Sequence, residues 1–351
     1  MTYFLAGFDG YNMHNFGSSL LFNGEETVEP YQITYFGGYG PNGINRAIAS
    51  KDSENSNILS GLAEDWDGYE IYSMMIHWAT ETTIVGVSEF LNYVHAKDPD
   101  GLLSYIFRGN DTLDGSNNAD VLMGFDGKDR FFGYDGTDTL EGGAGNDIYE
   151  FRDQDSDIVI DTSGIDTITS WISRSLEAHG DVENLTLLYQ PEYPDIDGTG
   201  NELDNRLIGT FQNNSLSGLD GADILRGGLG RDILTGGAGQ DDFDFNRTDD
   251  SGKKAATRDV ITDFRHRADD IDLSDIDANI WRSSNDAFTF LAKEGAAFTD
   301  KAGQLRWFQV DRAGTANDKT IIEGDTIGNG NADFQIELTG LINLTASDFI
   351  L

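Results

Sequence analysis

The chain has 351 residues, of which 62 are acidic and 23 are basic, so its formal net charge is −39. Such a charge repels nucleic acid and anionic lipid, and no apolar run approaches the roughly 18 residues that span a membrane, so neither nucleic-acid binding nor membrane insertion is expected. The sequence has 42 glycines and no cysteine, which excludes disulfides and thiolate metal sites.

Residues 1–105 are predicted to form a small β-rich or α+β module of unknown role. Alternating apolar residues over 70–78 predict a strand, and apolar spacing over 87–96 predicts a short amphipathic helix. None of the five histidines begins a His-Glu-x-x-His zinc motif, and no Gly-x-Ser-x-Gly nucleophile elbow is present. The sequence therefore gives no catalytic or cofactor-binding residue, and leaves open whether this module is an enzyme.

Residues 106–151 contain a nine-residue repeat. Its clearest copy, 142–150, has the form Gly-Gly-x-Gly-x-Asp-x-U-x, in which U is a large apolar residue. Five copies follow one another without insertion, and each has Leu, Phe or Tyr at the apolar position. A flexible linker would not place large apolar residues at such regular spacing. The repeat aspartates are Asp111, Asp120, Asp129, Asp138 and Asp147.

A second array of the same repeat occupies residues 200–245. The segment between the arrays, 152–199, has short alternating apolar stretches and is predicted to be a β spacer that extends the stacked strands. The second array has two asparagines followed by three aspartates at the acidic position, namely Asn205, Asn214, Asp223, Asp232 and Asp241. Its apolar position is always Leu or Phe.

The repeat predicts a parallel β-roll that binds calcium. Six residues make a glycine-rich turn and three make a short strand, so two repeats complete one coil and each turn stacks on the turn two repeats away. Ca²⁺ takes six to eight oxygen ligands, and a stacked pair of turns offers backbone carbonyls and two acidic side chains. The expected pairs are Asp111 with Asp129, Asp120 with Asp138, Asp129 with Asp147, Asp223 with Asp241, Asn214 with Asp232, and Asn205 with Asp223.

Calcium is the only cofactor expected, with up to about three ions per roll. Pairs that include asparagine carry less charge and should bind more weakly. Some turns are degenerate, because Ser116, Phe125, Tyr134 and Leu219 replace the second glycine. The residues expected to supply oxygens are the acidic residues and asparagines named above together with Gly109, Asn118, Gly127, Gly136, Gly143, Gly145, Gly221, Gly228, Gly230, Gly237 and Gly239.

The repeats over 109–151 and 200–245 resemble those of the RTX (hemolysin-type calcium-binding) family. This resemblance implies a calcium-loaded parallel β-roll and export by the type I secretion machinery. Residues 246–351 resemble the C-terminal domain of serralysin-type (M10) secreted proteases, which carries an uncleaved secretion signal. The ending Asp348-Phe-Ile-Leu351 matches that signal, and the N-terminus lacks the features of a cleaved signal peptide. The resemblance thus implies an extracellular protein without a protease domain.

One acidic stretch of the C-terminal segment, Asp325–Asp333, resembles a calcium loop, but Ile327 stands where an oxygen ligand would be needed. A polar turn between strands is the favoured interpretation. The alternation at Phe334, Ile336 and Leu338 predicts a strand leading out of this turn.

The fold is therefore expected to be mainly β, with two parallel β-rolls between a small N-terminal module and a C-terminal β domain. Because the calcium sites do not exist in the unfolded chain, binding free energy becomes folding free energy. The preferred function is a secreted calcium-binding protein that folds outside the cell and binds a polysaccharide or a cell surface without catalysis. The alternative is a small secreted, polysaccharide-directed enzyme with its site in 1–105.

Overall fold

The computed structural model describes residues 109–115, 119–152, 157–192, 195–312 and 317–351, and the backbone of five strands nearer the N-terminus. Four of these strands form an antiparallel sheet in the order β3-β2-β5-β4. The predicted strand over 70–78 contains β5, whereas the predicted helix over 87–96 lies outside the described residues. The five strands are β1 (Tyr3–Leu5), β2 (Ile33–Tyr39), β3 (Asn45–Ile48), β4 (Asn57–Leu59) and β5 (Met74–Ile76).

The chain divides into two compact units, Met1–Ile168 and Thr169–Leu351, and the division falls inside strand β12 (Thr167–Ser170). Each unit contains one of the two repeat arrays. The finer division at 105, 151, 199 and 245 stays a prediction.

The first unit contains a parallel β-roll, as the repeat predicts. Repeats contribute alternately to two sheets, so each strand pairs in parallel with the strand two repeats away, for example Leu113 with Phe131 and Leu122 with Leu140. One sheet has the order β1-β6-β8-β10 and the other β11-β9-β7. Their strands are β6 (Thr112–Asp114), β8 (Arg130–Phe132), β10 (Ile148–Phe151), β7 (Val121–Asp126), β9 (Thr139–Ala144) and β11 (Ile158–Ile160).

The core of this roll is the column of apolar residues at the eighth position of each repeat. A strand of three residues directs its central side chain to one face, and that face is the interior of the coil. The rings of Phe131 and Tyr149 stack with centroids 5.0 Å apart. The buried column is Leu113, Leu122, Phe131, Leu140 and Tyr149.

The second unit repeats this arrangement, with Leu207, Leu216, Leu225, Leu234 and Phe243 as its buried column. The strand order is β14-β16-β18-β20-β22-β27 in one sheet and β13-β15-β17-β19-β21 in the other. The first sheet contains β14 (Asn184–Leu187), β16 (Arg206–Ile208), β18 (Ile224–Arg226), β20 (Asp242–Asp244), β22 (Asp270–Asp272) and β27 (Phe349–Ile350). The second contains β13 (Arg174–Ser175), β15 (Gly198–Thr199), β17 (Ser215–Asp220), β19 (Ile233–Ala238) and β21 (Asp259–Ile261).

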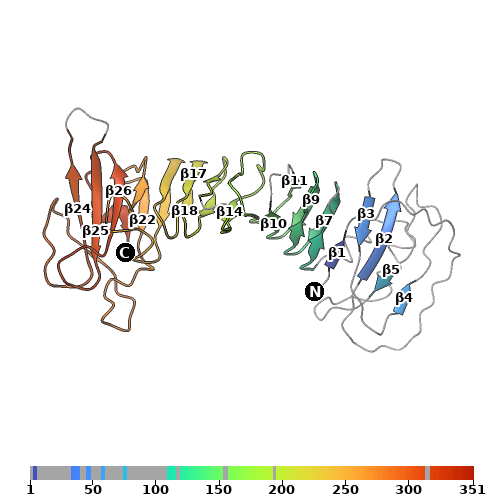
Figure 1. The fold of residues 1–351 in the computed structure, drawn as a ribbon, viewed down its shortest axis with the longest axis horizontal. Coiled ribbons are helices and arrows are strands. Elements are labelled where there is room, and N and C mark those ends of the chain that lie inside the picture. Colours follow the sequence, from blue (N-terminus) through green and yellow to red (C-terminus); the bar gives the residue numbers. More distant parts are fainter. Residues whose placement is uncertain are drawn as a thin grey trace. The chain divides into compact units, whose positions relative to one another are not determined.

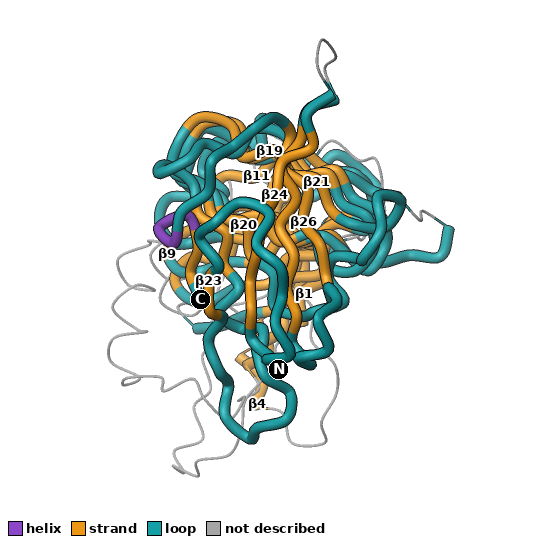
Figure 2. The backbone as a smooth tube through the Cα atoms, turned by 90° about the vertical axis from the view of Figure 1, so that its left-hand side faces the viewer, coloured by secondary structure: helices purple, strands orange, loops and turns teal. Residues whose placement is uncertain are grey.

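The C-terminal residues extend the second of these sheets. Strand β21 pairs in parallel with β26 (Phe334–Thr339). Strand β26 pairs antiparallel with β25 (Lys319–Asp325), and β25 pairs antiparallel with β24 (Gln304–Val310) (Figure 1). Strand β23 (Thr289–Phe290) pairs with β24. Among the described residues, the single helical element is the short 3₁₀ turn η1 (Ala346–Asp348), drawn in purple in Figure 2.

The acidic stretch between β25 and β26 is a polar turn, and the strand predicted after it is β26. Asp325 accepts hydrogen bonds from the backbone N–H groups of Gly328 and Gly330, at 2.7 and 2.8 Å. Asp333 accepts from the N–H of Thr326 at 2.8 Å and forms an ion pair with Lys253. Both carboxylates thus accept hydrogen bonds from the backbone of the turn and stabilise it, which agrees with the interpretation that the sequence favours.

Three bulky residues at the second turn position have positive φ, namely Phe125 (73°), Tyr134 (66°) and Leu219 (82°). Glycine adopts this conformation without strain, whereas other residues pay on the order of 1–3 kcal/mol. We expect Leu219→Gly to raise the free energy of unfolding by about 1 kcal/mol, after the greater backbone entropy of the unfolded glycine is subtracted. Urea unfolding in saturating calcium measures the change, and an unchanged or lower midpoint would contradict it.

Candidate metal centre

The turns of both rolls bring the backbones of stacked repeats into close contact. Five glycines at the fourth position of the repeat have positive φ, for example Gly127 and Gly145, both at 141°. A Cβ atom on Gly145 would overlap the carbonyl oxygen of Gly127, and one on Gly127 would overlap that of Gly109. Glycine is therefore required sterically, and its carbonyls form a column along the stacked turns.

From Asp129 in the first roll and from Asp223 in the second, each repeat aspartate connects two stacked turns through one carboxylate oxygen. The backbone N–H of the aspartate or asparagine two repeats earlier donates a hydrogen bond to Oδ1, for example from Asp111 to Asp129 at 2.7 Å and from Asn214 to Asp232 at 2.7 Å. The structure thereby brings together all six predicted pairs. The remaining distances are 2.8 Å for Asp120 to Asp138, 2.7 Å for Asp129 to Asp147, 2.8 Å for Asn205 to Asp223 and 3.2 Å for Asp223 to Asp241.

The second oxygen of these carboxylates is the feature that fits a cation. Within the described part of the chain, the buried Oδ2 atoms of Asp129, Asp147, Asp223 and Asp232 accept no hydrogen bond. In the turn of Asp223, this oxygen and the carbonyl of Gly236 from the next stacked turn both point at the open face of Gly218. Buried anionic oxygens without hydrogen bonds are costly, so a hard cation such as Ca²⁺ fits this donor set.

The leading glycines therefore belong to the candidate sites, although the repeat pattern predicts carbonyl ligands only from the second and fourth positions. At Gly124, the open face meets Asp129 Oδ2 and the Gly142 carbonyl, which repeats the geometry found at Gly218. A leading glycine thus has two roles. It has no Cβ that would fill the candidate cation position of its own turn, and its carbonyl oxygen faces the candidate position of the preceding stacked turn.

Burial shifts the protonation equilibria of these carboxylates strongly upward. Removal from water raises the pKa of Asp129 to about 9, of Asp232 to about 8, of Asp223 to about 7 and of Asp147 to about 6. Neighbouring aspartates add to the effect for Asp129 and Asp223. Ionised carboxylates at these positions need a nearby positive charge, because desolvation and mutual repulsion both oppose their ionisation.

The side-chain oxygens of the two asparagines of the second roll already accept hydrogen bonds from the backbone. Oδ1 of Asn205 accepts the N–H of Asn201 at 2.7 Å, and Oδ1 of Asn214 accepts the N–H of Thr210 at 2.6 Å. The side-chain amide of Asn205 also donates to the Glu183 carbonyl at 3.1 Å. Among the described residues, the corresponding Oδ2 atoms of Asp129, Asp147, Asp223 and Asp232 accept no hydrogen bond, so the geometry supports the expectation of weaker cation binding at the asparagine pairs.

Four turn aspartates stack at a spacing other than 18 residues. The N–H groups of Asp138 and Asp147 donate to Asp157 and Asp166, at 2.9 and 2.7 Å, across 19 residues instead of 18. In the second unit, Asp232 and Asp241 likewise donate to Asp259 and Asp269, across 27 and 28 residues. The sequence does carry a clue, because each of the four precedes a buried or strand residue by two places, as in Asp166-Thr-Ile168.

The turn that ends with Asp166 has one further acidic residue. Carboxylate oxygens of Asp147, Asp161 and Asp166 all lie within 4.8 Å of one another, and all three residues are buried. The hydroxyl of Tyr149 donates to Asp161 Oδ2 at 2.5 Å. Asp161 was not predicted, because a strict nine-residue register does not extend past Glu150.

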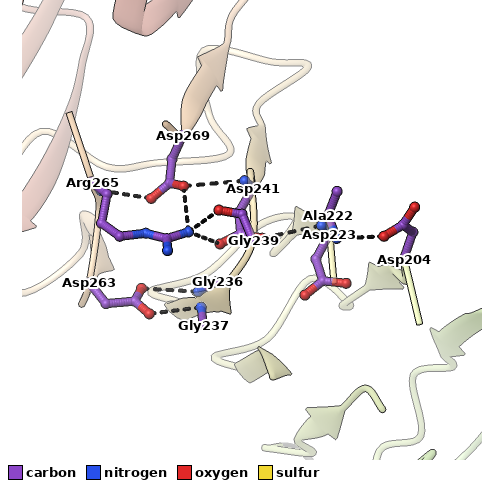
Figure 3. Close-up of polar contacts among 10 residues, drawn as sticks. All are labelled: Asp204, Ala222, Asp223, Gly236, Gly237, Gly239, Asp241, Asp263, Arg265 and Asp269. Carbon is purple, nitrogen blue, oxygen red and sulfur yellow. Dashed lines mark hydrogen bonds and ion pairs between the residues drawn. The ribbon is translucent and has the colours of Figure 1, made fainter. Parts of the chain in front are cut away.

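The last stacked pair of the second roll contains an internal cation. The guanidinium of Arg265 lies between Asp241 and Asp269, with Nη2 3.3 Å from Asp241 Oδ2 and 3.0 Å from Asp269 Oδ1 (Figure 3). The same nitrogen donates to the carbonyl of Gly239. The guanidinium contacts both carboxylates of this turn pair, so Arg265 supplies the positive charge here.

We expect Arg265→Gln to convert this pair into an additional calcium site. Removing the guanidinium leaves two buried carboxylates unneutralised, which should destabilise the unit by on the order of 1–2 kcal/mol at low calcium. Millimolar calcium should restore the stability and raise the stoichiometry in calorimetric titration by one ion. Arg247→Gln is the matched control, because Arg247 pairs with Asp249 on the surface. An unchanged stoichiometry would count against this assignment.

Of the residues predicted to bind calcium, Asn118 lies outside the described residues. The predicted aspartates are in the turns, and all except the half-buried Asp111 are buried. The predicted glycines with positive φ are Gly127, Gly136, Gly143, Gly145, Gly221, Gly228, Gly230 and Gly237. The assignment of each as a calcium ligand stays a proposal.

Two family models match the sequence. The RTX calcium-binding nonapeptide repeat matches residues 106–140 and 123–155, and the Peptidase M10 serralysin C-terminal model matches residues 199–351. The predicted resemblances to both families are thereby confirmed. No curated protein matches the chain. In the described part of the chain, no helix is long and apolar enough to span a membrane.

Two solved structures of mannuronan C5-epimerase subunits from Azotobacter vinelandii are similar to parts of the chain. The AlgE6R2 subunit is 30% identical with a TM-score of 0.27, and the match covers 44% of this chain and 90% of that one. The AlgE6R3 subunit is 18% identical with a TM-score of 0.22, and the match covers 70% of this chain and 79% of that one.

Proposed function

From the RTX calcium-binding repeats and the serralysin-type C-terminal domain that the chain carries, we propose that it is a secreted protein that folds around calcium after type I export. The observation that carries the proposal is the repeated arrangement in the turns. Buried carboxylate oxygens without hydrogen bonds face glycine carbonyls of the next stacked turn, for example Asp223 Oδ2 with the Gly236 carbonyl. Calcium supplies the positive charge that this arrangement needs.

The C-terminal end supports folding after export. Phe349 and Ile350 form strand β27, which pairs with β22, and the carboxylate of buried Asp348 accepts the N–H of Arg267 at 3.0 Å. A secretion machinery could read these residues only in an unfolded chain, because they are part of a sheet in the folded one. Low cytosolic calcium keeps the chain unfolded, since extracellular modules bind calcium with Kd of about 10⁻⁴–10⁻³ M. In this proposal the signal remains uncleaved.

Export is tested by expressing the chain in a bacterium that has a type I exporter. The full chain should accumulate in the medium, and a chain that lacks Asp348–Leu351 should remain in the cells at an equal total amount. Its mass in the medium should equal that of the complete chain, because the signal stays attached. Equal export of the truncated chain would overturn the assignment of the signal.

For the role outside the cell, we propose that the rolls present residues 1–105 to a polysaccharide or a cell surface without catalysis. The support is that the identified motifs account for calcium binding and export and include no catalytic set. Incubating the calcium-loaded chain with neutral and anionic polysaccharides, scored for both retention and cleavage, separates the possibilities. Retention that requires 1–105 supports a binding module, whereas new chain ends would establish the polysaccharide-directed enzyme instead.

A further inference from the structure

The first roll ends in a turn pair, Asp147 with Asp166, that has an additional acidic residue. In an ordinary pair, such as Asp129 with Asp147, Asp147 Oδ1 accepts the N–H of Asp129. Asp129 Oδ2 and the carbonyl of Gly142, the leading glycine of the next stacked turn, meet at the open face of Gly124. Asp161 precedes Asp166 by five residues, as Gly142 precedes Asp147. Asp161 therefore stands where a stacked repeat has its leading glycine.

The consequence is that a side-chain oxygen replaces a backbone oxygen. The open face of Gly142 meets Asp147 Oδ2, Asp161 Oδ2 and the hydroxyl of Tyr149, whereas the open face of Gly124 meets a carboxylate and a carbonyl. Asp147 is 1% exposed and its Oδ2 accepts no hydrogen bond among the described residues, although it points into this cluster. No hydrogen bond within the described cluster satisfies this buried oxygen, so it is the strongest sign that a cation binds here.

The spacing of the oxygens fits one calcium ion. Ligands at 2.3–2.6 Å from a common Ca²⁺ are at most about 5 Å apart, and the three carboxylates lie within 4.8 Å of one another. The remaining oxygens of the cluster are engaged in ways that fix its geometry. Asp161 Oδ1 accepts the N–H groups of Thr162 and Ser163, at 2.6 and 3.1 Å, and Asp166 Oδ1 accepts the N–H of Asp147.

We propose that Asp147, Asp161 and Asp166 form a three-carboxylate calcium site that closes the first roll and binds tighter than the ordinary turn pairs. The site rests on the calcium role proposed above and specifies which residues of this chain set its strongest affinity. A third carboxylate adds one negative charge to the ligand set, and ligand charge is one of the properties that tune calcium affinity in oxygen sites. Tyr149 is a positioning residue, because its hydroxyl orients Asp161.

The test is a calorimetric calcium titration of the full chain at neutral pH, in buffer freed of calcium by resin. One ion should bind about tenfold tighter than the remainder, as expected for one added ligand charge. Asp161→Gly restores the repeat consensus and should bring that ion into the weaker class without changing the total stoichiometry. Asp135→Asn is the control, since Asp135 is an exposed acid in the same roll, and it should retain the tight step.

A second readout keeps the proposal testable if Asp161→Gly folds poorly. Tb³⁺ binds oxygen sites and emits when a nearby tyrosine is excited, so the first equivalent of Tb³⁺ should be sensitised through Tyr149. Tyr149→Phe should remove most of the emission of that first equivalent, and Asp161→Asn should shift it to higher Tb³⁺ concentration by about tenfold. A tight step that survives both Asp161 variants, or first-equivalent emission that survives Tyr149→Phe, would overturn this site while leaving calcium-dependent folding intact.

Discussion

Without calcium, the rolls should become less stable as the pH rises from about 4 to about 9. Burial raises the pKa of Asp129 and Asp259 to about 9, of Asp232 to about 8 and of Asp223 to about 7. In that range the folded state holds protons that the unfolded state has already lost, so each unit of pH costs stability. Protons and calcium thus neutralise the same carboxylates, and acid should partly replace the metal.

Thermal unfolding followed by circular dichroism, in buffer freed of calcium by resin, measures this effect. We expect a cooperative transition near pH 5 and little or no folded roll near pH 8, whereas millimolar calcium should restore the fold at pH 8. Below about pH 4 the fold should weaken again, because the Arg258 and Lys319 side chains hold the pKa of Glu337 below its usual value and that ion pair is lost on protonation. Stability that rises from pH 5 to pH 8 in the absence of calcium would contradict this account.

A single methyl group at a leading glycine should abolish one calcium site. The Cβ of Gly218→Ala would overlap Asp223 Oδ2 and the carbonyl of Gly236, which are the oxygens that converge on the candidate cation position. Overpacking and the loss of one bound ion together should cost about 2–4 kcal/mol in millimolar calcium. Calorimetric titration should show one ion fewer, and urea unfolding should show the lower stability.

Gly180→Ala is the matched control for that substitution. Gly180 is exposed, and a Cβ there would contact no atom within 4 Å. It should leave both the stoichiometry and the unfolding midpoint unchanged. If Gly218→Ala behaves like Gly180→Ala, the open face of the leading glycine is not a calcium position.

The sequence was sufficient to predict the rolls because the repeat encodes each level of their structure. The apolar eighth residue gives the buried column, for example Leu207 and Leu225, and the glycines give the turns. The nine-residue period then fixes the register, in which each strand pairs with the strand two repeats away. The predicted acidic pairs follow from that register alone.

The remaining turn contacts escaped prediction because they depend on insertions and on tertiary contacts. One residue added after Glu150 moves Asp157 and Asp166 out of register, although they stack as the repeat aspartates do. No period predicts that Arg265 fills the last turn pair, since its guanidinium reaches Asp241 across 24 residues. Asp161 could not be predicted from the repeat either, because it occupies the position of the leading glycine and so departs from the consensus.

The central claim is that near neutral pH the rolls fold only around calcium, and a far-UV circular dichroism titration at pH 7.5 tests it most directly. The chain should lack strand structure in calcium-free buffer and gain it cooperatively as calcium rises into the range of about 10⁻⁴–10⁻³ M. Chelation should reverse the change, whereas the same concentration of Mg²⁺ should not produce it. A strand spectrum that is already complete without calcium, and unchanged on its addition, would contradict the account.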